Sequence, residues 1–421
     1  MKKLVINGGK KYITISHPHE IWPPKANLRE LFEIAIQRNR DIGIKGKTGP
    51  IKKFEDLFSL FLKKQTKYQI TFNSGTSALF AAYFALGLTD KDEVIGPALT
   101  YHAALSPLYI LKANVVLVDI DPKTRCIDAN KIEEKITVNT KAITVVHQWG
   151  HPADMDKVLE IAKKYNLKVI EDCSHAHGSE YKGKLCGTFG DVAVFSLQTN
   201  KAIFAGEGGI LVTNNDNYYY RATLLGHYRD RSREEIKDEE YKKYWVTGFG
   251  LKLRMSPFNA IVAKHSLLRF SKTIEQRHKC LNYFNNRLKE ISYIEPVFIA
   301  PYVYMGAWYG FKPLYLKEKL NNISREKLIQ ILQKEGMEIS DPSGPVLSTQ
   351  PLYYEKKSKM FPNLDKKSNN VSDTPNAKII EENALSFPTF SNFKRDKKII
   401  DQYINAMKKV QENVNNIVDN K

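Results

Sequence analysis

The chain has 421 residues, 42% of them hydrophobic, which is enough for two or three domains with substantial cores. No stretch approaches the roughly 20 apolar residues of a membrane helix, and the first residues turn to glycine too early for a signal peptide, so we expect a cytoplasmic protein. The formal net charge is +18, but lysines are interleaved with acidic residues and asparagine, which is typical of solvated helix faces rather than of a nucleic-acid-binding surface.

The N-terminal part, residues 1–30, contains Trp22-Pro23-Pro24 and is expected to form an extended arm lying on the body of the protein or on a partner. We expect a large domain over residues 31–265 and a smaller C-terminal α/β domain over 266–421, joined by a linking helix. The four cysteines lack metal-site spacing and are expected to be free thiols.

Short β-rich runs alternate with helical patterns between residues 70 and 215. Several runs are continuously apolar, as strands buried on both faces should be. The alternation predicts an α/β fold with a large, mostly parallel sheet, whose ligands sit at the carboxyl ends of the strands. The predicted strands are Gln69–Phe72, Glu93–Gly96, Val115–Val118, Ala142–Val146, Leu167–Ile170, Val192–Phe195 and Gly209–Val212.

The pattern becomes helical from Ser256 to about residue 290, which places the linking helix there. Residues 358–377 are polar and rich in lysine and asparagine, so we expect a long surface loop. The tail from Lys394 to Lys421 is expected to form an amphipathic helix that frays at its end.

A phosphate-binding turn is predicted at Asn73-Ser74-Gly75-Thr76-Ser77-Ala78-Leu79, between a strand and a helix over Ala78–Leu86. Small residues allow backbone amides to approach an anion, hydroxyls add donors, and the helix terminus adds partial positive charge. The alternative is a plain N-cap formed by Thr76 or Ser77. Ser196 would be a further phosphate ligand.

Asp172 ends one predicted strand, and Lys201 follows the next. An amine that can form a Schiff base, with a carboxylate that can keep a pyridine nitrogen protonated, is what pyridoxal phosphate chemistry requires. His175 could contact the ring oxygen or the ring face. Each of these residues alone has a structural explanation, and the ordered set is what favours the functional one.

A zinc site is an alternative, because the side chains of four nearby residues can all bind zinc, namely Asp172, Cys173, His175 and His177. Asp172 and Cys173 are consecutive and would have to point the same way, which the end of a strand resists. We therefore expect no metal.

Six motifs follow one another along the chain, namely Asn73–Leu79, Val118–Asp121, Gly150–Asp156, Glu171–Gly178, Phe195–Lys201 and Gly206–Gly209. Their order resembles that of the DegT/StrS family of pyridoxal phosphate-dependent sugar aminotransferases. The Phe-Ser-Leu-Gln and His-Ala-His-Gly runs are more similar to the branch that contains 3-amino-5-hydroxybenzoate synthase and the scyllo-inosose aminotransferases.

The resemblance implies an aspartate aminotransferase-like structure of fold type I, and a homodimer with shared active sites. It implies that Lys201 forms the Schiff base, Asp172 holds the pyridine nitrogen, His175 contacts the ring oxygen, and Tyr101 stacks on the cofactor. The residues that match phosphate ligands are Thr76, Ser77 and Ser196, with Gly75 in the same turn.

Lys252 marks a departure, because many members of the family have asparagine there. We expect Lys252 to reach the phosphate across the dimer, and the alternative is a solvent-facing lysine.

These features predict a transaminase that moves an amino group from glutamate or glutamine to a keto-sugar or keto-cyclitol, whether nucleotide-linked, phosphorylated or free. A dehydratase of the same family is disfavoured because such members replace the lysine with histidine, but an aromatising synthase remains open. A non-catalytic, cofactor-binding regulatory protein is a third possibility. The sequence offers too many cations to choose one for the donor carboxylate. It also leaves the role of the charged insert 229–243 open, and places the acceptor pocket on loops such as 149–151, 221–245, 307–309 and 343–353.

Overall fold

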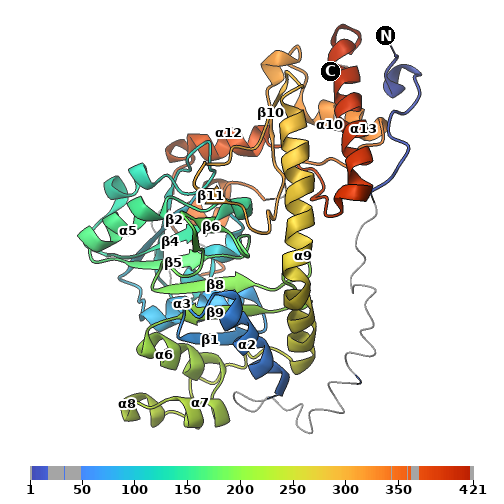
Figure 1. The fold of residues 1–421 in the computed structure, drawn as a ribbon. Helices are drawn as coiled ribbons and strands as arrows, with labels where there is room; N and C mark the ends of the chain where they lie inside the picture. Colours follow the sequence, from blue (N-terminus) through green and yellow to red (C-terminus); the bar gives the residue numbers. More distant parts are fainter. Residues whose placement is uncertain are drawn as a thin grey trace.

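The computed structural model describes residues 2–17, 33, 49–342, 344–357, 359–361 and 369–417. Its centre is a seven-stranded sheet in the order β1-β9-β8-β5-β4-β2-β3, in which only β9 runs against the other strands (Figure 1). All seven predicted strands form. They are β1 (Tyr68–Phe72), β2 (Glu93–Pro97), β3 (Asn114–Val118), β4 (Thr140–Val146), β5 (Lys168–Asp172), β8 (Val192–Ser196) and β9 (Gly209–Thr213).

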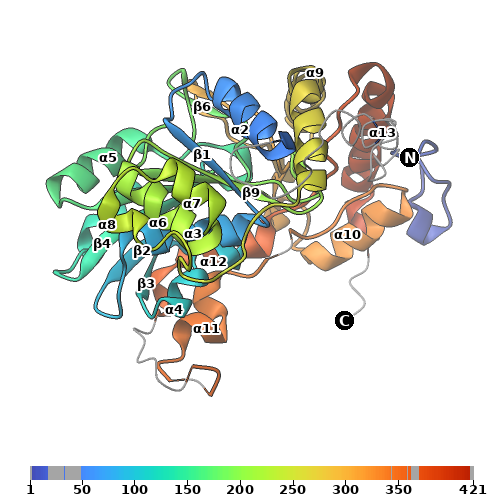
Figure 2. The ribbon, with the colours of Figure 1, turned by 90° about the horizontal axis from the view of Figure 1, so that it is seen from below.

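Helices cover both faces of this sheet (Figures 1 and 2). Those that precede the linking helix are α2 (Gly49–Phe61), α3 (Gly75–Leu86), α4 (Pro107–Ile110), α5 (Met155–Lys164), α6 (Asp216–Gly226), α7 (Asp230–Glu235) and α8 (Glu239–Lys242). The linking helix and those after it are α9 (Pro257–Leu288), α10 (Arg325–Lys334), α11 (Pro351–Tyr354), α12 (Pro375–Asn383) and α13 (Phe393–Glu412). Among the described residues, no helix combines the length and the apolar character that crossing a bilayer requires.

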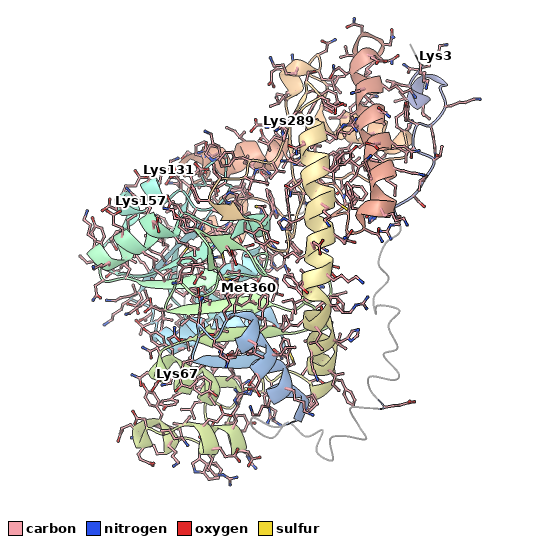
Figure 3. All side chains as sticks on the ribbon, viewed as in Figure 1. Lys3, Lys67, Lys131, Lys157, Lys289 and Met360 are labelled. Carbon is pink, nitrogen blue, oxygen red and sulfur yellow. The ribbon has the colours of Figure 1, made fainter. Side chains whose placement is uncertain are left out.

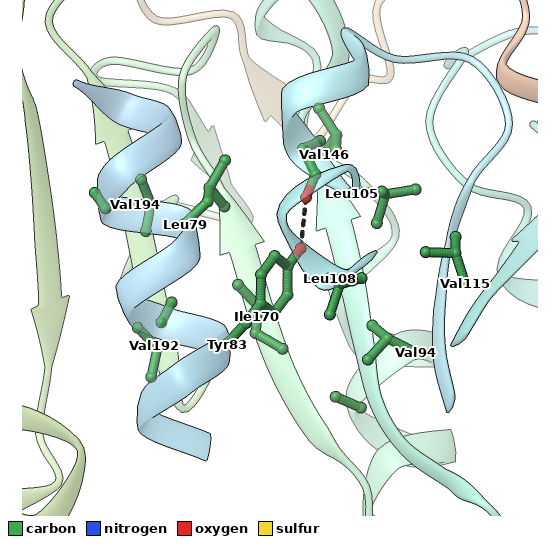
Figure 4. Close-up of a cluster of buried hydrophobic side chains, with 14 of the residues drawn as sticks. Leu79, Tyr83, Val94, Leu105, Leu108, Val115, Val146, Ile170, Val192 and Val194 are labelled. Atoms are coloured by element: carbon green, nitrogen blue, oxygen red, sulfur yellow. Dashed lines mark hydrogen bonds between the residues drawn. The ribbon is translucent and has the colours of Figure 1, made fainter. Parts of the chain in front are cut away.

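Strand β8 shows why the sheet is buried on both sides. Val192 and Val194 join the core beneath α3 and α6, whereas Ala193 and Phe195 join the core that contains α2 and the first half of α9. In Figure 4, Tyr83 of α3 lies in the first of these cores, where its hydroxyl donates to the Ala104 carbonyl oxygen at 2.5 Å. The unbroken apolar runs of the sequence follow from this two-sided burial.

The second half of α9 packs with α10 and α13 around a separate core, which also takes in Leu4 and Ile13. Lys409 of α13 reinforces this contact, because its Nζ lies 2.9 Å from both carboxylate oxygens of Glu335 and donates to the Lys10 carbonyl oxygen at 3.0 Å. Residues 2–17 therefore lie on the C-terminal part of the same chain. The Trp22-Pro23-Pro24 part of the expected arm lies outside the described residues.

Two small sheets complete the structure around the large one. The first has three strands in the order β11 (Val303–Tyr304), β6 (Glu180–Tyr181) and β7 (Lys184–Leu185), and the second pairs β10 (Ile294–Glu295) with β12 (Leu314–Tyr315). The expected domain boundary at 265/266 falls inside the continuous helix α9, so that division stays a prediction.

Residues 358–377 were expected to be a surface loop, and the part that the structure describes is more ordered than that. The Asn369 side chain docks on the outer edge of β3, where its oxygen accepts from Leu117 N–H at 2.8 Å and its nitrogen donates to the Val115 carbonyl oxygen at 3.1 Å. Helix α12 then begins at Pro375. A side-chain amide thus continues the hydrogen-bonding pattern of an edge strand.

The excess lysines are dispersed, as the interleaved sequence predicts. In Figure 3, Lys3, Lys67 and Lys289 lie on separate parts of the molecule, whereas Lys131 and Lys157 lie near each other. Lys67 pairs with Asp216 at 2.6 Å, and Lys131 pairs with Asp119 at 3.1 Å. Acidic neighbours therefore offset part of the positive charge locally.

Candidate active site

A cavity of about 1990 Å³ lies at the carboxyl ends of β4, β5 and β8 and extends along α9 to the C-terminal part of the chain. Parallel α/β sheets place their ligands at this edge. The structure brings most of the predicted site residues together here. The lining includes Gly75, Thr76, Tyr101, Asp172, His175, Ser196 and Lys201.

Asp172 is the last residue of β5 and is only 5% exposed. One of its carboxylate oxygens accepts the Ser174 N–H at 2.9 Å. Burial raises the pKa of the Asp172 carboxyl, while the hydrogen bonds from Ser174 and the charge of Lys201 act in the opposite direction. A desolvated carboxylate of this kind is stabilised by a cationic partner, such as a protonated pyridine nitrogen.

Lys201 lies in the turn after β8. Its N–H donates to the Gln198 carbonyl oxygen at 2.8 Å, and Thr199 holds the turn through its N–H to the Gly206 carbonyl oxygen, also at 2.8 Å. Burial lowers the pKa of the Lys201 amine to about 8, against the opposing effect of Asp172. Roughly one molecule in ten then carries a neutral amine at pH 7, compared with about one in two thousand for an ordinary lysine.

His175 and Tyr309 form the wall beside Lys201. Their rings are stacked with 4.1 Å between centroids and 8° between planes, and Lys201 Nζ lies 4.0 Å from the Tyr309 centroid. The Nδ1 of His175 accepts the Trp149 N–H at 3.4 Å, so the neutral ring carries its proton on Nε2. Burial, together with the charge of Lys201, holds the His175 pKa well below its usual value.

The predicted phosphate-binding turn has a different cap from the one expected. Ser74 is the N-cap, because its Oγ accepts the Ser77 N–H at 3.0 Å, and α3 begins at Gly75 rather than at Ala78. Thr76 and Ser77 are therefore not the capping residues. All three hydroxyl side chains could cap a helix, and only the backbone conformation of Ser74 is extended as a cap requires.

Gly75 lies directly against Ser196. A Cβ atom at residue 75 would lie 2.8 Å from Ser196 Cβ, so only glycine allows the first turn of α3 to approach the end of β8 this closely. The N-terminal N–H groups of α3 and the Ser196 hydroxyl thereby share one corner of the cavity. That arrangement suits an anion.

Two predicted residues do not line the cavity. The Ser77 hydroxyl lies 2.9 Å from Ser74 Oγ. The Lys252 side chain is exposed, on the segment between α8 and α9. Their roles in binding a phosphate stay predictions, and that of Lys252 depends on a second subunit.

Other cavity residues were not singled out from the sequence. Lys312 is one, and its position between apolar neighbours in Phe311-Lys312-Pro313-Leu314 was an available signal. Gln148 is another, 5% exposed, and its Oε1 has no hydrogen-bond partner among the described residues. Gln148 follows β4, and Asp172 ends the neighbouring strand β5. The position of Gln148 in the same cavity as Asp172 could therefore have been inferred from the order of the strands.

His147, Glu171 and Cys173 lie close enough to hold a metal ion, but hydrogen bonds account for the two polar members. Glu171 accepts from His147 Nε2 at 3.1 Å and from the backbone N–H groups of Gly187, Phe189 and Gly190 at 2.7 to 2.8 Å. The Nδ1 of His147 accepts the Ala153 N–H at 3.1 Å. This buried network anchors the loops around the ends of β4 and β5.

The chain is similar to several known proteins. A family model described as the DegT/DnrJ/EryC1/StrS aminotransferase family matches residues 35–406. A GDP-perosamine synthase from Escherichia coli O157:H7 is 35% identical over 67% of this chain and 72% of that protein. An L-glutamine:scyllo-inosose aminotransferase from Streptomyces griseus is 29% identical over 98% of this chain and 99% of its own length. The X-ray structure of an aminotransferase from Psychrobacter cryohalolentis matches with a TM-score of 0.80 at 25% identity, and the match covers 94% of this chain and 100% of that chain.

Proposed function

This chain belongs to the DegT/DnrJ/EryC1/StrS aminotransferase family, and on that premise we propose that it transfers an amino group from glutamate or glutamine to a keto-sugar or keto-cyclitol. It is a transaminase of fold type I, in a family that depends on pyridoxal phosphate. The names of its relatives support both acceptor classes, since one is a GDP-perosamine synthase and another acts on scyllo-inosose with L-glutamine. The acceptor can be nucleotide-linked, phosphorylated or free.

The residues around the cavity fit pyridoxal phosphate. When bound, it supplies a reactive aldehyde and an electron-withdrawing ring. Asp172 would face the ring nitrogen and His175 the ring oxygen. The first turn of α3 with Ser196 would hold the phosphate. Tyr101, which is 62% exposed at the cavity, would cover the ring.

The observation that carries the proposal is that a desolvated Lys201 amine and the buried Asp172 carboxylate line the same cavity at one end of the sheet. With a pKa of about 8, Lys201 can both accept and return a proton near neutral pH. It would move that proton between the α-carbon of the donor and the cofactor. An exposed lysine with an ordinary pKa would be almost fully protonated and would be a poor base.

We further propose a homodimer that shares its active sites and acts in the cytoplasm. The segment that carries Lys252 also exposes apolar side chains, namely Tyr244 (52%), Val246 (47%), Phe249 (67%) and Leu251 (37%). An exposed apolar group of this kind favours burial against another chain. Lys252 would then be carried toward the phosphate corner of the neighbouring subunit.

The test is spectroscopic. The purified protein, incubated with pyridoxal phosphate, should gain the visible absorbance of a lysine-bound cofactor and lose it on addition of glutamate or glutamine. Lys201→Ala should not gain the band, whereas Lys184→Ala, which alters an exposed lysine, should behave as the wild type. Asp172→Asn should keep the fold, because its side-chain oxygen can still accept from Ser174, but should convert the donor far more slowly.

A wild-type spectrum that stays unchanged with every donor would contradict the transaminase function. If conversion occurs, keto-sugar and keto-cyclitol acceptors should restore the original spectrum, and the mass of the product should show an amine in place of the carbonyl oxygen. A product that has lost a further hydroxyl would indicate elimination instead.

A further inference from the structure

A second lysine lines the cavity. Lys312 is partly buried, and its Nζ donates a hydrogen bond to the Ser386 hydroxyl. Burial lowers the pKa of Lys312 to about 8, with the charge of Asp341 opposing the shift. Among the described residues, the Lys312 ammonium has no carboxylate within ion-pair distance.

A small backbone ladder fixes the position of Lys312. Phe311 bridges to Phe387, and Ser386 bridges to Ser340. The Ser386 N–H donates to the Ser340 carbonyl oxygen at 2.7 Å, and Leu385 N–H donates to the Pro313 carbonyl oxygen at 2.9 Å. The ammonium and the serine hydroxyl are thus held side by side before any ligand arrives.

Gly310 connects Lys312 to the catalytic wall. A Cβ atom at residue 310 would lie 3.3 Å from Lys312 Cε and 3.1 Å from Trp149 Cδ1, so the lysine stem passes over Gly310 beside the indole. The backbone N–H of Trp149 in turn donates to His175 Nδ1. After burial and the charge of Lys201, the charge of Lys312 also contributes to lowering the pKa of His175.

The other cations that line the cavity differ from Lys312. Arg395 is paired with Asp396 at 2.5 Å, and Arg277 donates to the Ala307 carbonyl oxygen at 3.0 Å. Arg269 lies on an exposed position of α9. Compared with these arginines, Lys312 combines partial burial, a position held by Ser386, and a stem that lies beside Trp149, the residue whose backbone N–H donates to His175.

We propose that Lys312 and Ser386 bind a carboxylate of the amino donor and hold it against the wall formed by Tyr309 and His175. This assignment rests on the proposed transaminase function and supplies the cation that the sequence left open. One ammonium with one hydroxyl matches a carboxylate, which carries a single negative charge. A phosphate dianion would call for more donors, and the corner at Gly75 and Ser196 already offers them.

The experiment uses the cofactor-loaded protein and three variants. Lys312→Met removes the charge and keeps the stem, Lys312→Arg keeps the charge, and Lys319→Met removes an exposed charge from the same segment as a matched control. Three quantities are measured for each protein, and the calorimetric binding of inorganic phosphate is the third. The first is the glutamate concentration that gives half-maximal conversion of the cofactor. The second is the binding of glutarate, an unreactive dicarboxylate, by calorimetry.

We expect Lys312→Met to raise the half-maximal glutamate concentration and the glutarate Kd by about 10- to 100-fold, the effect of one charged hydrogen bond. Its absorbance band should be unchanged, because Lys201 is intact. Lys312→Arg should recover part of the affinity, and Lys319→Met should match the wild type.

Unchanged glutamate and glutarate affinities in Lys312→Met would overturn the assignment. Weaker binding of inorganic phosphate with unchanged glutarate affinity would also overturn it, and would instead indicate a site for a phosphorylated acceptor. If the wild type itself fails to convert with any donor, the proposed function fails. The glutarate titration still tests Lys312 in that case, because it needs no turnover.

Discussion

The amine of Lys201 lies 4.0 Å from the centroid of the Tyr309 ring. The same ring stacks on His175, so one tyrosine contacts both the proposed catalytic base and the proposed partner of the ring oxygen. Tyr309 thereby contributes to the burial that lowers the Lys201 pKa, and it separates the amine from water in the protein without cofactor.

Replacing Tyr309 with alanine is expected to move the Lys201 pKa from about 8 toward its ordinary value of 10.5, because the amine gains water contact. Capture of pyridoxal phosphate by the apoprotein should then reach half its maximal rate at a higher pH. Stopped-flow absorbance between pH 6.5 and pH 10 would measure this shift.

Tyr304 provides the control for that experiment. It stacks on His278 with 4.5 Å between centroids and 10° between planes, and so forms a similar tyrosine–histidine pair outside the cavity lining. Tyr304→Ala should leave the pH profile of cofactor capture unchanged. Equal shifts in the two variants would mean that the effect is global and does not come from the wall beside Lys201.

Lys201 should also affect stability. Between pH 8 and pH 10.5 the unfolded chain keeps a proton on Lys201 that the folded chain has lost. The lowered pKa therefore destabilises the fold by its full amount below pH 8, and this loss of stability fades as the pH rises toward 10.5. Lys201→Met should therefore stabilise the apoprotein by up to about 3 kcal/mol at pH 7. Denaturant unfolding at pH 7 and near pH 10.5 would check this. A stability difference that stays constant with pH would contradict the lowered pKa.

The charged insert 229–243 is anchored by a buried ion pair. Arg231 of α7 contacts both carboxylate oxygens of Glu55 in α2 at 2.9 and 3.0 Å, and Glu55 also accepts from the Thr71 N–H of β1 at 2.9 Å. No residue of this insert lines the cavity of its own chain.

Glu55→Gln should lower the free energy of unfolding by up to about 3 kcal/mol, because the buried guanidinium loses the partner that it contacts through both carboxylate oxygens and keeps only the Glu235 carboxylate at 3.3 Å. The neighbouring Asp56 is the matched control, since it forms an exposed pair with Lys52 in the same helix. Asp56→Asn should change stability by less than about 1 kcal/mol. If both variants lower the free energy of unfolding by a similar amount, the buried pair stabilises the fold no more than the exposed pair does.

The proposed sharing of active sites can be tested by mixing inactive chains. If Lys201 acts in its own subunit and Lys252 reaches the neighbouring one, a heterodimer of Lys201→Ala and Lys252→Met chains contains one site with both native lysines. Activity should then recover after the two variants are mixed under conditions that exchange subunits. A Lys252→Met homodimer that is active before mixing would favour a solvent-facing Lys252. No recovery, despite exchange shown by mass spectrometry, would contradict the sharing of sites through Lys252.

The motif order was enough to recognise the family, and the match of the family model confirms it. The seven strands were predictable because apolar runs such as Val192–Phe195 are buried on both faces. The location of Asp172 and Lys201 in one cavity was predictable because strand ends gather at one edge of a parallel sheet, while their catalytic roles stay predictions. The proximity of these residues is thus a consequence of local pattern and topology.

Other features depend on contacts that no local pattern encodes. Tyr309 reaches Lys201, and Lys312 reaches the same cavity, only because the C-terminal segments pack across the ends of the strands. The cap of α3 could have been any of three hydroxyl residues in a row, and backbone conformation selects Ser74. Lys252 requires a second chain, which places its function beyond what one subunit shows.

The docking of Asn369 has a consequence for aggregation of the chain during its synthesis. The residue that completes the open edge of β3 lies 252 positions after Leu117, so the ribosome delivers it on the order of 10 to 50 s after the strand emerges. During that interval the unpaired N–H and carbonyl groups of β3 are free to pair with other nascent chains. Late arrival of a single amide makes the half-synthesised protein the form most exposed to aggregation.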